Sequence, residues 1–344
     1  MDSFLKLRGV SKRYGKVQAL KGISLSLQED ELVVVLGPTG AGKTTLLRTI
    51  VGLESPEEGS IIMEGREITH DAPADRYMAM VFQDFSLYPD WTVRRNLEFP
   101  LRAPGRRYTK EEIQERVEWA ATMLRINHLL GRDSNQLSGG EMQRVTIGRA
   151  IVRRPKLFLM DEPLSNLDAK LREELRVEIA CLRRELGTPM IYVTHDQAEA
   201  LSMADRIIVL SNGEILQTGT PEEIYRAPAT PEVALQLGQP KINLLPVTRS
   251  DGQWVTGNGL ALLDVRDSRP ERMMLGVRPE DIEPTGGKEV ATVEVVEDMG
   301  ATRILVVNWW GHRIHITVPK SFACGPGDEV YPHIRTERAI LWDP

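Results

Sequence analysis

Residues 31–50 read ELVVVLGPTGAGKTTLLRTI, and this stretch decides the fold of the chain. Its aliphatic run, Leu32 to Leu36, predicts a strand that is buried on both faces. A glycine-rich turn follows, and apolar residues then recur at helical spacing through Leu46, Leu47 and Ile50. The order strand, turn, helix is the context that a phosphate-binding loop requires.

The turn fills the pattern G-x-x-x-x-G-K-[ST] with Gly37, Gly42, Lys43 and Thr44. Glycines let backbone N–H groups close around phosphate oxygens, and the helix N-terminus adds a partial positive charge. We expect Lys43 to reach the β- and γ-phosphates and Thr44 to offer its hydroxyl to Mg²⁺. A turn that binds nothing is the alternative, which the complete match disfavours. The residues expected to surround a nucleoside triphosphate are Gly37, Pro38, Thr39, Gly40, Ala41, Gly42, Lys43, Thr44 and Thr45.

The composition bounds the class of protein. A length of 344 residues predicts two or three domains, and the net charge of −6 argues against a protein whose main partner is nucleic acid. No apolar run approaches the roughly 18 to 20 residues of a membrane span, and the N-terminus MDSFLKLRGV has no signal-peptide pattern. Cys181 and Cys324 form no C-x-x-C pair. We therefore expect a protein of a reducing compartment, the cytosol.

Two adjacent acids follow another predicted strand, Lys156–Met160. Ligands bind at the carboxyl ends of strands in parallel sheets, so Asp161 and Glu162 are placed to act on a bound nucleotide. Asp161 would hold Mg²⁺ through its water shell, and Glu162 would orient or deprotonate the attacking water. The alternative, an acidic strand end that only aids solubility, is weak here.

Three more side chains stand at turns or strand ends. Tyr14 falls in a predicted hairpin, where tyrosine is either packing or a flat surface for adenine, and the sequence favours neither. Gln83 follows the predicted strand Met78–Phe82 and is either an ordinary surface residue or a ligand and sensor of Mg²⁺. His195 follows the predicted strand Met190–Val193. A lone histidine is more often structural, but this position makes His195 a candidate contact for the γ-phosphate.

A helical insert is predicted from Thr92 to about Gln143. Thr109 and Glu112 have the spacing of a capping box, and so do Ser138 and Glu141. Glycines 139 and 140 are poor helix formers, yet they occupy the first turn after Ser138. They leave backbone N–H groups open, so this second helix N-terminus also suits an anion.

The character of the chain changes near Gly238. The remaining residues form short alternating strands such as VATVEVVED and HRIHITV, separated by Gly, Pro and Asp. This pattern predicts a small β-barrel domain of the oligomer-binding type. Of Trp309 and Trp310, we expect one in the core and one on the surface. His312 and His315 are an odd number apart, which disfavours a metal pair on one strand.

The motifs in order resemble those of ABC transporter ATPase subunits. They are the Gly37–Thr44 loop, LSGGEMQR at 137–144, LFLMDEP at 157–163 and His195, with LSGGEMQ the most specific. The resemblance implies an α/β P-loop ATPase core with a helical subdomain at about 84–150, within a domain of residues 1–239. It implies an oligomer-binding-type (TOBE) regulatory β-domain at 240–344, marked by LGVRPEDIEP.

The resemblance also implies roles for individual residues. Tyr14 matches the adenine-stacking aromatic, Gln83 the Q-loop, Ser165–Asp168 the D-loop and His195 the switch histidine. The turn at Ser138 would bind the γ-phosphate of ATP held by the other subunit of a head-to-tail pair. The implied catalytic residues are Glu162, His195 and Gln83, and the implied Mg²⁺ ligands are Thr44, Gln83 and Asp161. Outside the loop, the implied nucleotide contacts are Tyr14, Ser138, Gly139, Gly140, Gln143, Asp161 and Asp168.

The implied partners are a second ATPase subunit, identical or closely related, two transmembrane permease subunits and an extracytoplasmic solute-binding protein. The chain would then lie peripherally on the cytoplasmic face of the plasma membrane. VFQDFSLYPDWTV and GQPKINLLPV are most similar to the carbohydrate importers, and importers of glycerol phosphate, polyamines, sulfate and ferric iron share the architecture. Glu141 and Met142 stand where many sugar-importer subunits have Gln-Arg, which changes no phosphate-binding group.

Two rival functions are disfavoured. Soluble ABC ATPases of translation usually carry two ATPase units, and those of DNA repair insert long coiled coils, whereas this chain has one unit and neither insert. The other rival makes the β-barrel a binding module in its own right. Co-purification with a membrane permease would separate the importer from both.

Overall fold

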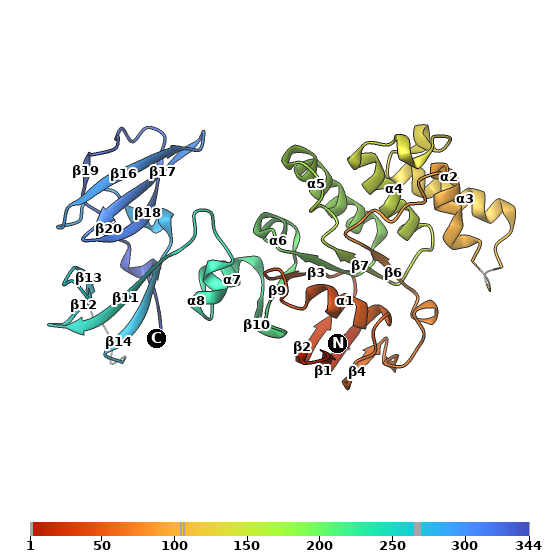
Figure 1. Ribbon diagram of the computed structural model, residues 1–344, viewed down its shortest axis with the longest axis horizontal. Coiled ribbons are helices and arrows are strands. Elements are labelled where there is room, and N and C mark those ends of the chain that lie inside the picture. Colours follow the sequence, from red (N-terminus) through yellow and green to blue (C-terminus); the bar gives the residue numbers. More distant parts are fainter. Residues whose placement is uncertain (1–2, 104, 106, 265–269, 344) are drawn as a thin grey trace. The chain divides into compact units, whose positions relative to one another are not determined.

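A computed structural model describes residues 3–103, 105, 107–264 and 270–343 of the chain. The expected domain ends at residues 1 and 344 lie outside these ranges. The chain divides into two compact units, Met1–Glu222 and Glu223–Pro344 (Figure 1). The first is an α/β unit and the second is rich in β-strands, which confirms the predicted fold class.

A six-stranded sheet forms the centre of the first unit. Its strand order is β10-β9-β3-β8-β7-β6, with β10 antiparallel at one edge and the other strands parallel. All five residues of β3 are buried, as the sequence predicts. The strands are β3 (Leu32–Leu36), β6 (Met78–Val81), β7 (Leu157–Asp161), β8 (Met190–Thr194), β9 (Arg206–Ser211) and β10 (Glu214–Gly219).

Helix α1 (Lys43–Val51) packs between this sheet and a second, antiparallel sheet. Val33 and Val35 of β3 share one core cluster with Leu46, Leu47 and Ile50 of α1. Helices α5 (Ala169–Leu186) and α6 (Gln197–Met203) cover the opposite face of the parallel sheet (Figure 1). The second sheet has the order β2-β1-β4-β5, from β1 (Leu5–Tyr14), β2 (Val17–Leu27), β4 (Glu58–Met63) and β5 (Arg66–Glu67). Layers on both faces therefore bury β3 and fix the loop that follows it.

The predicted helical insert lies between β6 and β7. Its helices are α2 (Val93–Glu98), α3 (Lys110–Met123) and α4 (Gly139–Ile151). Both predicted capping boxes are present: Thr109 caps α3, and Ser138 caps α4. Short 3₁₀ turns lie at 99–101, 127–129 and 134–136 within this insert, and another, at 73–75, precedes β6. The segment from Gln83 to Trp91 is not helical, so it joins β6 to α2 as a loop.

The second unit contains two larger sheets around one core. Their strand orders are β13-β12-β11-β14-β21 and β18-β17-β16-β19, and β15 pairs with β20. Trp254, Leu275, Leu305 and Ile316 from the two larger sheets lie in the same buried cluster. The strands are β11 (Asn243–Ser250), β12 (Gln253–Thr256), β13 (Ala261–Asp264), β14 (Arg272–Val277), β15 (Ile282–Glu283), β16 (Ala291–Asp298), β17 (Thr302–Trp309), β18 (His312–Pro319), β19 (Glu329–Val330), β20 (His333–Ile334) and β21 (Ile340–Trp342).

The compact division falls between Glu222 and Glu223, before residue 239, where the first domain is expected to end. The intervening residues form most of α7 (Pro221–Arg226) and all of α8 (Pro231–Leu235). They form contacts within the β-rich unit: Trp342 Nε1 donates to the carbonyl oxygen of Pro228 at 2.9 Å. Arg278 likewise donates to the carbonyl oxygens of Tyr225 and Leu237. These long-range contacts carry no sequence signal.

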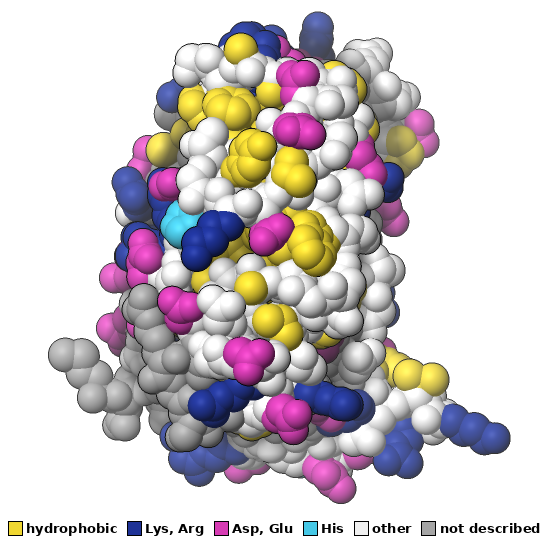
Figure 2. Space-filling view, turned by 90° about the vertical axis from the view of Figure 1, so that its left-hand side faces the viewer, with side chains coloured by type: hydrophobic (Ala, Val, Ile, Leu, Met, Phe, Trp, Pro, Cys, Tyr) yellow, Lys and Arg dark blue, Asp and Glu magenta, His cyan; other side chains and the backbone are white. Residues whose placement is uncertain are grey.

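The surface of the β-rich unit carries single exposed apolar side chains. Trp310 is 43% exposed and Trp309 only 3%, so one tryptophan is in the core and the other on the surface, as predicted. On the face drawn in Figure 2, coloured hydrophobic side chains form small groups among acidic and basic ones. Such a mixture is typical of a solvated protein surface.

Candidate functional site

The loop before α1 is built by close backbone approach. A Cβ at Gly37 would lie 2.2 Å from the carbonyl oxygen of Leu210, and one at Gly42 would lie 2.4 Å from that of Ala19. Gly42 also has φ +103°, which side chains rarely adopt. No side chain caps the N-terminus of α1. The first backbone N–H groups of α1 are therefore free for an anion.

A cavity of about 620 Å³ opens beside this loop. Residues far apart in sequence meet there: Gln83 after β6, Glu162 after β7 and His195 after β8. The cavity also has walls that sequence reasoning missed, from β2 and from the Asn212-Gly213 turn between β9 and β10. The lining residues are Val17, Gln18, Ala19, Lys21, Thr39, Gly40, Gly42, Lys43, Thr44, Thr45, Gln83, Glu162, His195, Asn212 and Gly213.

The Asn212-Gly213 turn holds the loop from one side. The Gly213 N–H donates to the carbonyl oxygen of Ala41 at 3.0 Å, and the Lys21 N–H donates to the Gly213 oxygen at 2.9 Å. A Cβ at Gly213 would lie 2.7 Å from the carbonyl oxygen of Ala19. The dipeptide Asn-Gly predicts a hairpin turn, but nothing in it indicates which loop the turn will contact.

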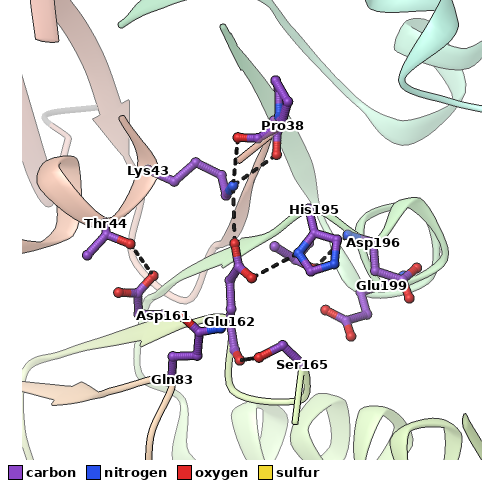
Figure 3. A network of polar contacts seen from close by, with 12 residues as sticks. Pro38, Lys43, Thr44, Gln83, Asp161, Glu162, Ser165, His195, Asp196 and Glu199 are labelled. Carbon is purple, nitrogen blue, oxygen red and sulfur yellow. Dashed lines mark hydrogen bonds and ion pairs between the residues drawn. The ribbon is translucent and has the colours of Figure 1, made fainter. Parts of the chain in front are cut away.

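Lys43 points into the cavity and is 5% exposed. Its Nζ donates to the carbonyl oxygens of Gly37 and Pro38 at 2.9 and 3.0 Å. The same Nζ forms an ion pair with Glu162 Oε1 at 3.1 Å (Figure 3). A phosphate that binds Lys43 therefore replaces contacts that Lys43 already makes.

Glu162 joins Lys43 to His195. Its second oxygen, Oε2, lies 2.8 Å from His195 Nδ1 (Figure 3). The backbone of Glu162 has φ +44°, an unusual conformation for a residue with a side chain. Such strain persists where the surroundings hold it, and here the Glu162 N–H donates to the carbonyl oxygen of Val193 at 3.0 Å.

Asp161 and Thr44 form a second pair, of which Thr44 lines the cavity and Asp161 does not. The Thr44 hydroxyl donates to Asp161 Oδ1 at 3.0 Å, and Asp161 is 4% exposed. Burial raises the pKa of Asp161 above its ordinary value, although the Thr44 hydrogen bond acts in the opposite direction. A nearby cation would favour the carboxylate, so this chemistry fits a metal.

The candidate metal ligands Thr44, Gln83 and Asp161 supply only one carboxylate. Within the described part of the chain, no group of three or more His, Cys, Asp or Glu residues could hold a metal ion. Mg²⁺ is usually held by one or two carboxylates together with phosphate oxygens and water. The donor set therefore fits Mg²⁺ that arrives with a nucleotide.

The second helix N-terminus, at α4, is capped. The Glu141 N–H donates to Ser138 Oγ at 3.4 Å, and the Ser138 N–H donates to Glu141 Oε2 at 2.8 Å. A Cβ at Gly140 would lie 2.8 Å from Leu171 Cδ1, so the glycine also allows α4 to pack against α5. This packing reason for glycine is invisible in the sequence.

Five predicted site residues on α4 and α5 do not line the cavity of their own chain, namely Ser138, Gly139, Gly140, Gln143 and Asp168. Ser138 is exposed, whereas Gln143 is fully buried. The side-chain amide of Gln143 has no hydrogen-bond partner in the described part of the chain. Asp168 caps α5 by accepting the Leu171 N–H at 3.0 Å.

Tyr14 also lies outside the cavity lining and is 43% exposed. Lys12 Nζ stands 5.3 Å from the centre of its ring. Burial and the hydrogen-bonded Glu54 carboxylate raise the pKa of the Tyr14 hydroxyl, and a hydrogen bond with Thr45 acts in the opposite direction. Its hydroxyl thus lies beside the first turn of α1, and Lys12 stands over one face of the ring.

Comparison with known proteins gives one family. The family model described as ABC transporter matches residues 20–165. A solved nucleotide-free ATP-binding cassette of an ABC transporter superposes with a TM-score of 0.62 at 28% identity, covering 68% of this chain and 98% of that one.

Two curated relatives match nearly the whole chain. The sn-glycerol-3-phosphate import ATP-binding protein UgpC of Jannaschia sp. (strain CCS1) is 46% identical over 93% of this chain and 92% of its own length. The sulfoquinovosyl glycerol transport ATP-binding protein SmoE of Agrobacterium fabrum (strain C58 / ATCC 33970) is 40% identical over 98% of this chain and 97% of its own length. The chain therefore belongs to the ATP-binding, ATP-hydrolysing subunits of ABC transporters.

Proposed function

We propose that the chain powers the import of a carbohydrate or polyol solute, with sn-glycerol 3-phosphate as the alternative. The observation that carries the ATPase mechanism is the cluster of Lys43, Glu162 and His195 beside the uncapped N-terminus of α1. The solute is supported by the relatives, which are named for sn-glycerol-3-phosphate and for sulfoquinovosyl glycerol.

Each residue of the cluster has a distinct role in hydrolysis. The N–H groups of the Gly37–Thr45 loop and the Lys43 ammonium bind the β- and γ-phosphates. Thr44, Asp161 and Gln83 hold Mg²⁺, which neutralises phosphate charge when it is bound. Once phosphate replaces Glu162 at Lys43, the Glu162 carboxylate is free to accept a proton from water. His195 then contacts the γ-phosphate, and Tyr14 stacks on adenine.

A second ATPase subunit completes the site. The exposed Ser138 turn does not line the cavity of its own chain, so it is available to a nucleotide held by another subunit. Gln143 is proposed to contact the same nucleotide, but its side-chain amide is fully buried and must first become exposed. Gly139 and Gly140 offer backbone N–H groups at the same end of α4, and Asp168 lies at the start of α5. Two chains in head-to-tail arrangement would form two such sites.

A groove of about 440 Å³ suits a permease subunit. Its walls include Tyr88 and Phe99, which contact each other edge to face and are both partly exposed. The groove lies along the loop that begins at Gln83, so a permease segment seated there would sense the nucleotide site. Among the described residues, no helix has both the length and the apolar character needed to cross a membrane. We assign the chain to the cytoplasmic face of the membrane, with an extracytoplasmic binding protein as the further partner.

The β-rich unit is proposed as a regulatory domain. Every residue assigned to phosphate lies before residue 200, in the α/β unit. Residues 240–344, the oligomer-binding-type domain, are thus not needed to bind or hydrolyse ATP.

The mechanism is tested at Glu162. Glu162→Gln keeps the shape of the side chain but removes the base, so turnover should fall by roughly 10²- to 10⁴-fold while ATP still binds. Lys43→Ala should weaken ATP binding itself. Glu173→Gln, an exposed position on α5, is the control for loss of one carboxylate. Near-normal turnover of Glu162→Gln would refute the assigned role.

The solute is tested with the permease and binding protein in liposomes. Stimulation of ATPase activity by a neutral sugar or polyol supports the first choice, and stimulation by sn-glycerol 3-phosphate alone supports the alternative.

A further inference from the structure

Arg172, in the first turns of α5, contacts two loops of the site. Its Nη2 donates to the carbonyl oxygen of Leu167 at 3.1 Å, and its Nη1 pairs with Asp196 Oδ2 at 3.4 Å. Leu167 belongs to the turn that follows Glu162, and Asp196 follows His195 directly. One guanidinium group therefore joins the backbone after Glu162 to the turn that carries His195.

The His195 turn is held from within by a polar network. Thr194 Oγ1 accepts the Asp196 N–H at 2.9 Å, and Asp196 Oδ1 accepts the Ala198 N–H at 2.7 Å. Beneath them, the buried Glu199 accepts the Tyr192 hydroxyl at 2.9 Å. Burial raises the pKa of Glu199 above its ordinary value. Hydrogen bonds within the turn thus tie Asp196 to its neighbours, so a shift of Asp196 would also move the backbone that carries the His195 imidazole.

The turn after Glu162 is similarly compact. The Ser165 hydroxyl donates to the carbonyl oxygen of Glu162 at 2.9 Å (Figure 3), and the Leu167 N–H donates to that of Leu164 at 3.3 Å. Because Glu162 has a left-handed backbone, its orientation depends on the contacts that hold this turn. Leu167 ends the turn, and its oxygen is the atom that Arg172 binds.

We propose that Arg172 is a positioning residue for hydrolysis, which keeps the side chains of Glu162 and His195 in contact with each other. The inference rests on the proposed roles of those two residues. Arg172 does not line the nucleotide cavity, so it acts through the two turns. A guanidinium fork can bind two acceptors in fixed directions, which an ammonium cannot do as well.

A stabilising ion pair alone would not explain this arrangement. The side chains of Arg172 and Asp196 are 33% and 25% exposed, and partly exposed pairs contribute little to the free energy of folding. The contact between Glu162 Oε2 and His195 Nδ1, at 2.8 Å, depends on two separate loops. A misplacement of about 1 Å in such a site can reduce the rate about 10²-fold.

The experiment compares Arg172→Met, Asp196→Asn and the double variant in the full chain. Asp196→Asn is suitable because its amide oxygen can still cap α6, while the charge that attracts Arg172 is lost. We expect kcat for ATP to fall by roughly 10- to 100-fold in each single variant, with KM within about twofold of wild type. The double variant should be no slower than the slower single variant, because both changes break one link.

Two controls separate positioning from folding. Arg176→Met removes an arginine one turn along α5 and should leave kcat unchanged. Arg172→Lys retains the positive charge but not the forked guanidinium group. Its kcat should lie between those of wild type and Arg172→Met. Thermal melting and ATP-binding stoichiometry show the folded fraction of each variant, so that kcat is expressed per intact site.

Three outcomes would overturn the inference: normal kcat per intact site in Arg172→Met, losses that multiply in the double variant, or an equal loss in Arg176→Met. Glu162→Gln, assayed in parallel, distinguishes the two levels of the proposal. If Glu162→Gln is inactive and Arg172→Met is normal, only the role of Arg172 fails. If Glu162→Gln is active, the proposed function of Glu162 fails, and the role of Arg172 fails with it.

Discussion

The two helix N-termini assigned to phosphate, those of α1 and α4, are built differently. α1 follows Gly42, has no side-chain cap and has no acidic residue in its first turn. α4 follows Ser138, which forms a complete capping box with Glu141. The first helix leaves its N–H groups to a ligand, whereas the second satisfies part of its own need for hydrogen bonds.

This difference separates a primary site from a supplementary one. At α1, the loop, Lys43 and the uncapped N-terminus converge on one cavity. At α4, a carboxylate already occupies the first turn, so the available groups are the Ser138 hydroxyl and the glycine N–H groups. The second N-terminus suits the exposed end of a phosphate chain that another subunit holds.

The carboxyl groups beside the two helices have pKa values shifted in opposite directions. Burial raises the pKa of Asp161 near α1. At α4, the hydrogen bond from the Ser138 backbone lowers the pKa of Glu141. Asp161 is therefore poised to gain from an added cation, and Glu141 already has its partner.

The largest expected effect comes from combining defects at the two helices. Lys43→Ala should be inactive because its own loop fails, and Ser138→Arg should be inactive because it blocks the partner's phosphate. A mixture should regain ATPase activity, since one of the two sites in a mixed pair combines an intact loop with an intact Ser138 turn. Activity that never rises above that of either parent, although cross-linking shows mixed pairs, would count against a shared site.

Glycine replacement in the loop before α1 should show how much the close backbone approach matters there. Gly42→Ala places a Cβ against the backbone oxygen of Ala19 at φ +103°, so ATP affinity should fall roughly 5- to 150-fold, the factor that strain of about 1–3 kcal/mol gives. Gly40→Ala is the control, because φ +83° is also strained but no atom lies within 4 Å of its Cβ. Equilibrium dialysis with ATP measures both dissociation constants. Equal losses would show that backbone conformation matters more than close approach.

Loss of the α4 cap should have a moderate effect on stability. Ser138→Ala should lower the free energy of unfolding by about 1 kcal/mol, the usual cost of removing a cap. Thr109→Ala, which removes the matching cap of α3, should cost a similar amount. Only Ser138→Ala should also reduce ATPase activity, so urea unfolding and turnover measured together separate the two roles. Equal turnover in both variants would contradict a contact between Ser138 and phosphate.

The smallest effects concern pH. The raised pKa of Asp161 means that its contribution to stability is present below its ordinary pKa of 3.8 and is lost as pH rises through the higher value. Asp161→Asn should therefore raise the melting temperature of the nucleotide-free chain near pH 7, by no more than a few degrees, and the gain should shrink in acid.

Glu141 should behave in the opposite way. Its lowered pKa gives a contribution that is present above its ordinary value of 4.5 and is lost as pH falls through the lower value. Glu141→Gln should thus lower the melting temperature near pH 7 and have less effect in acid. Melting curves of both variants between pH 4 and pH 8 test this pair, and pH dependences of the same sign would refute it.

Local signals made much of this protein predictable. The buried strand at Leu32–Leu36, the glycine loop before Lys43 and the capping boxes at Thr109 and Ser138 all involve residues within a few positions of each other. Their geometry follows from spacing and from backbone chemistry that short segments already specify. The Asp161-Glu162 pair is predictable for a similar reason, since it stands at the carboxyl end of a strand.

The sequence by itself thus determined the elements and the chemistry at the ends of the strands. Only the tertiary structure decided which distant groups meet: the Asn212-Gly213 turn against the loop, Arg172 between Leu167 and Asp196, and α8 against the β-rich unit. The order of strands in the sheets brings these residues together in space. A side chain carries no local mark of the partner that the packing of sheets and helices brings to it.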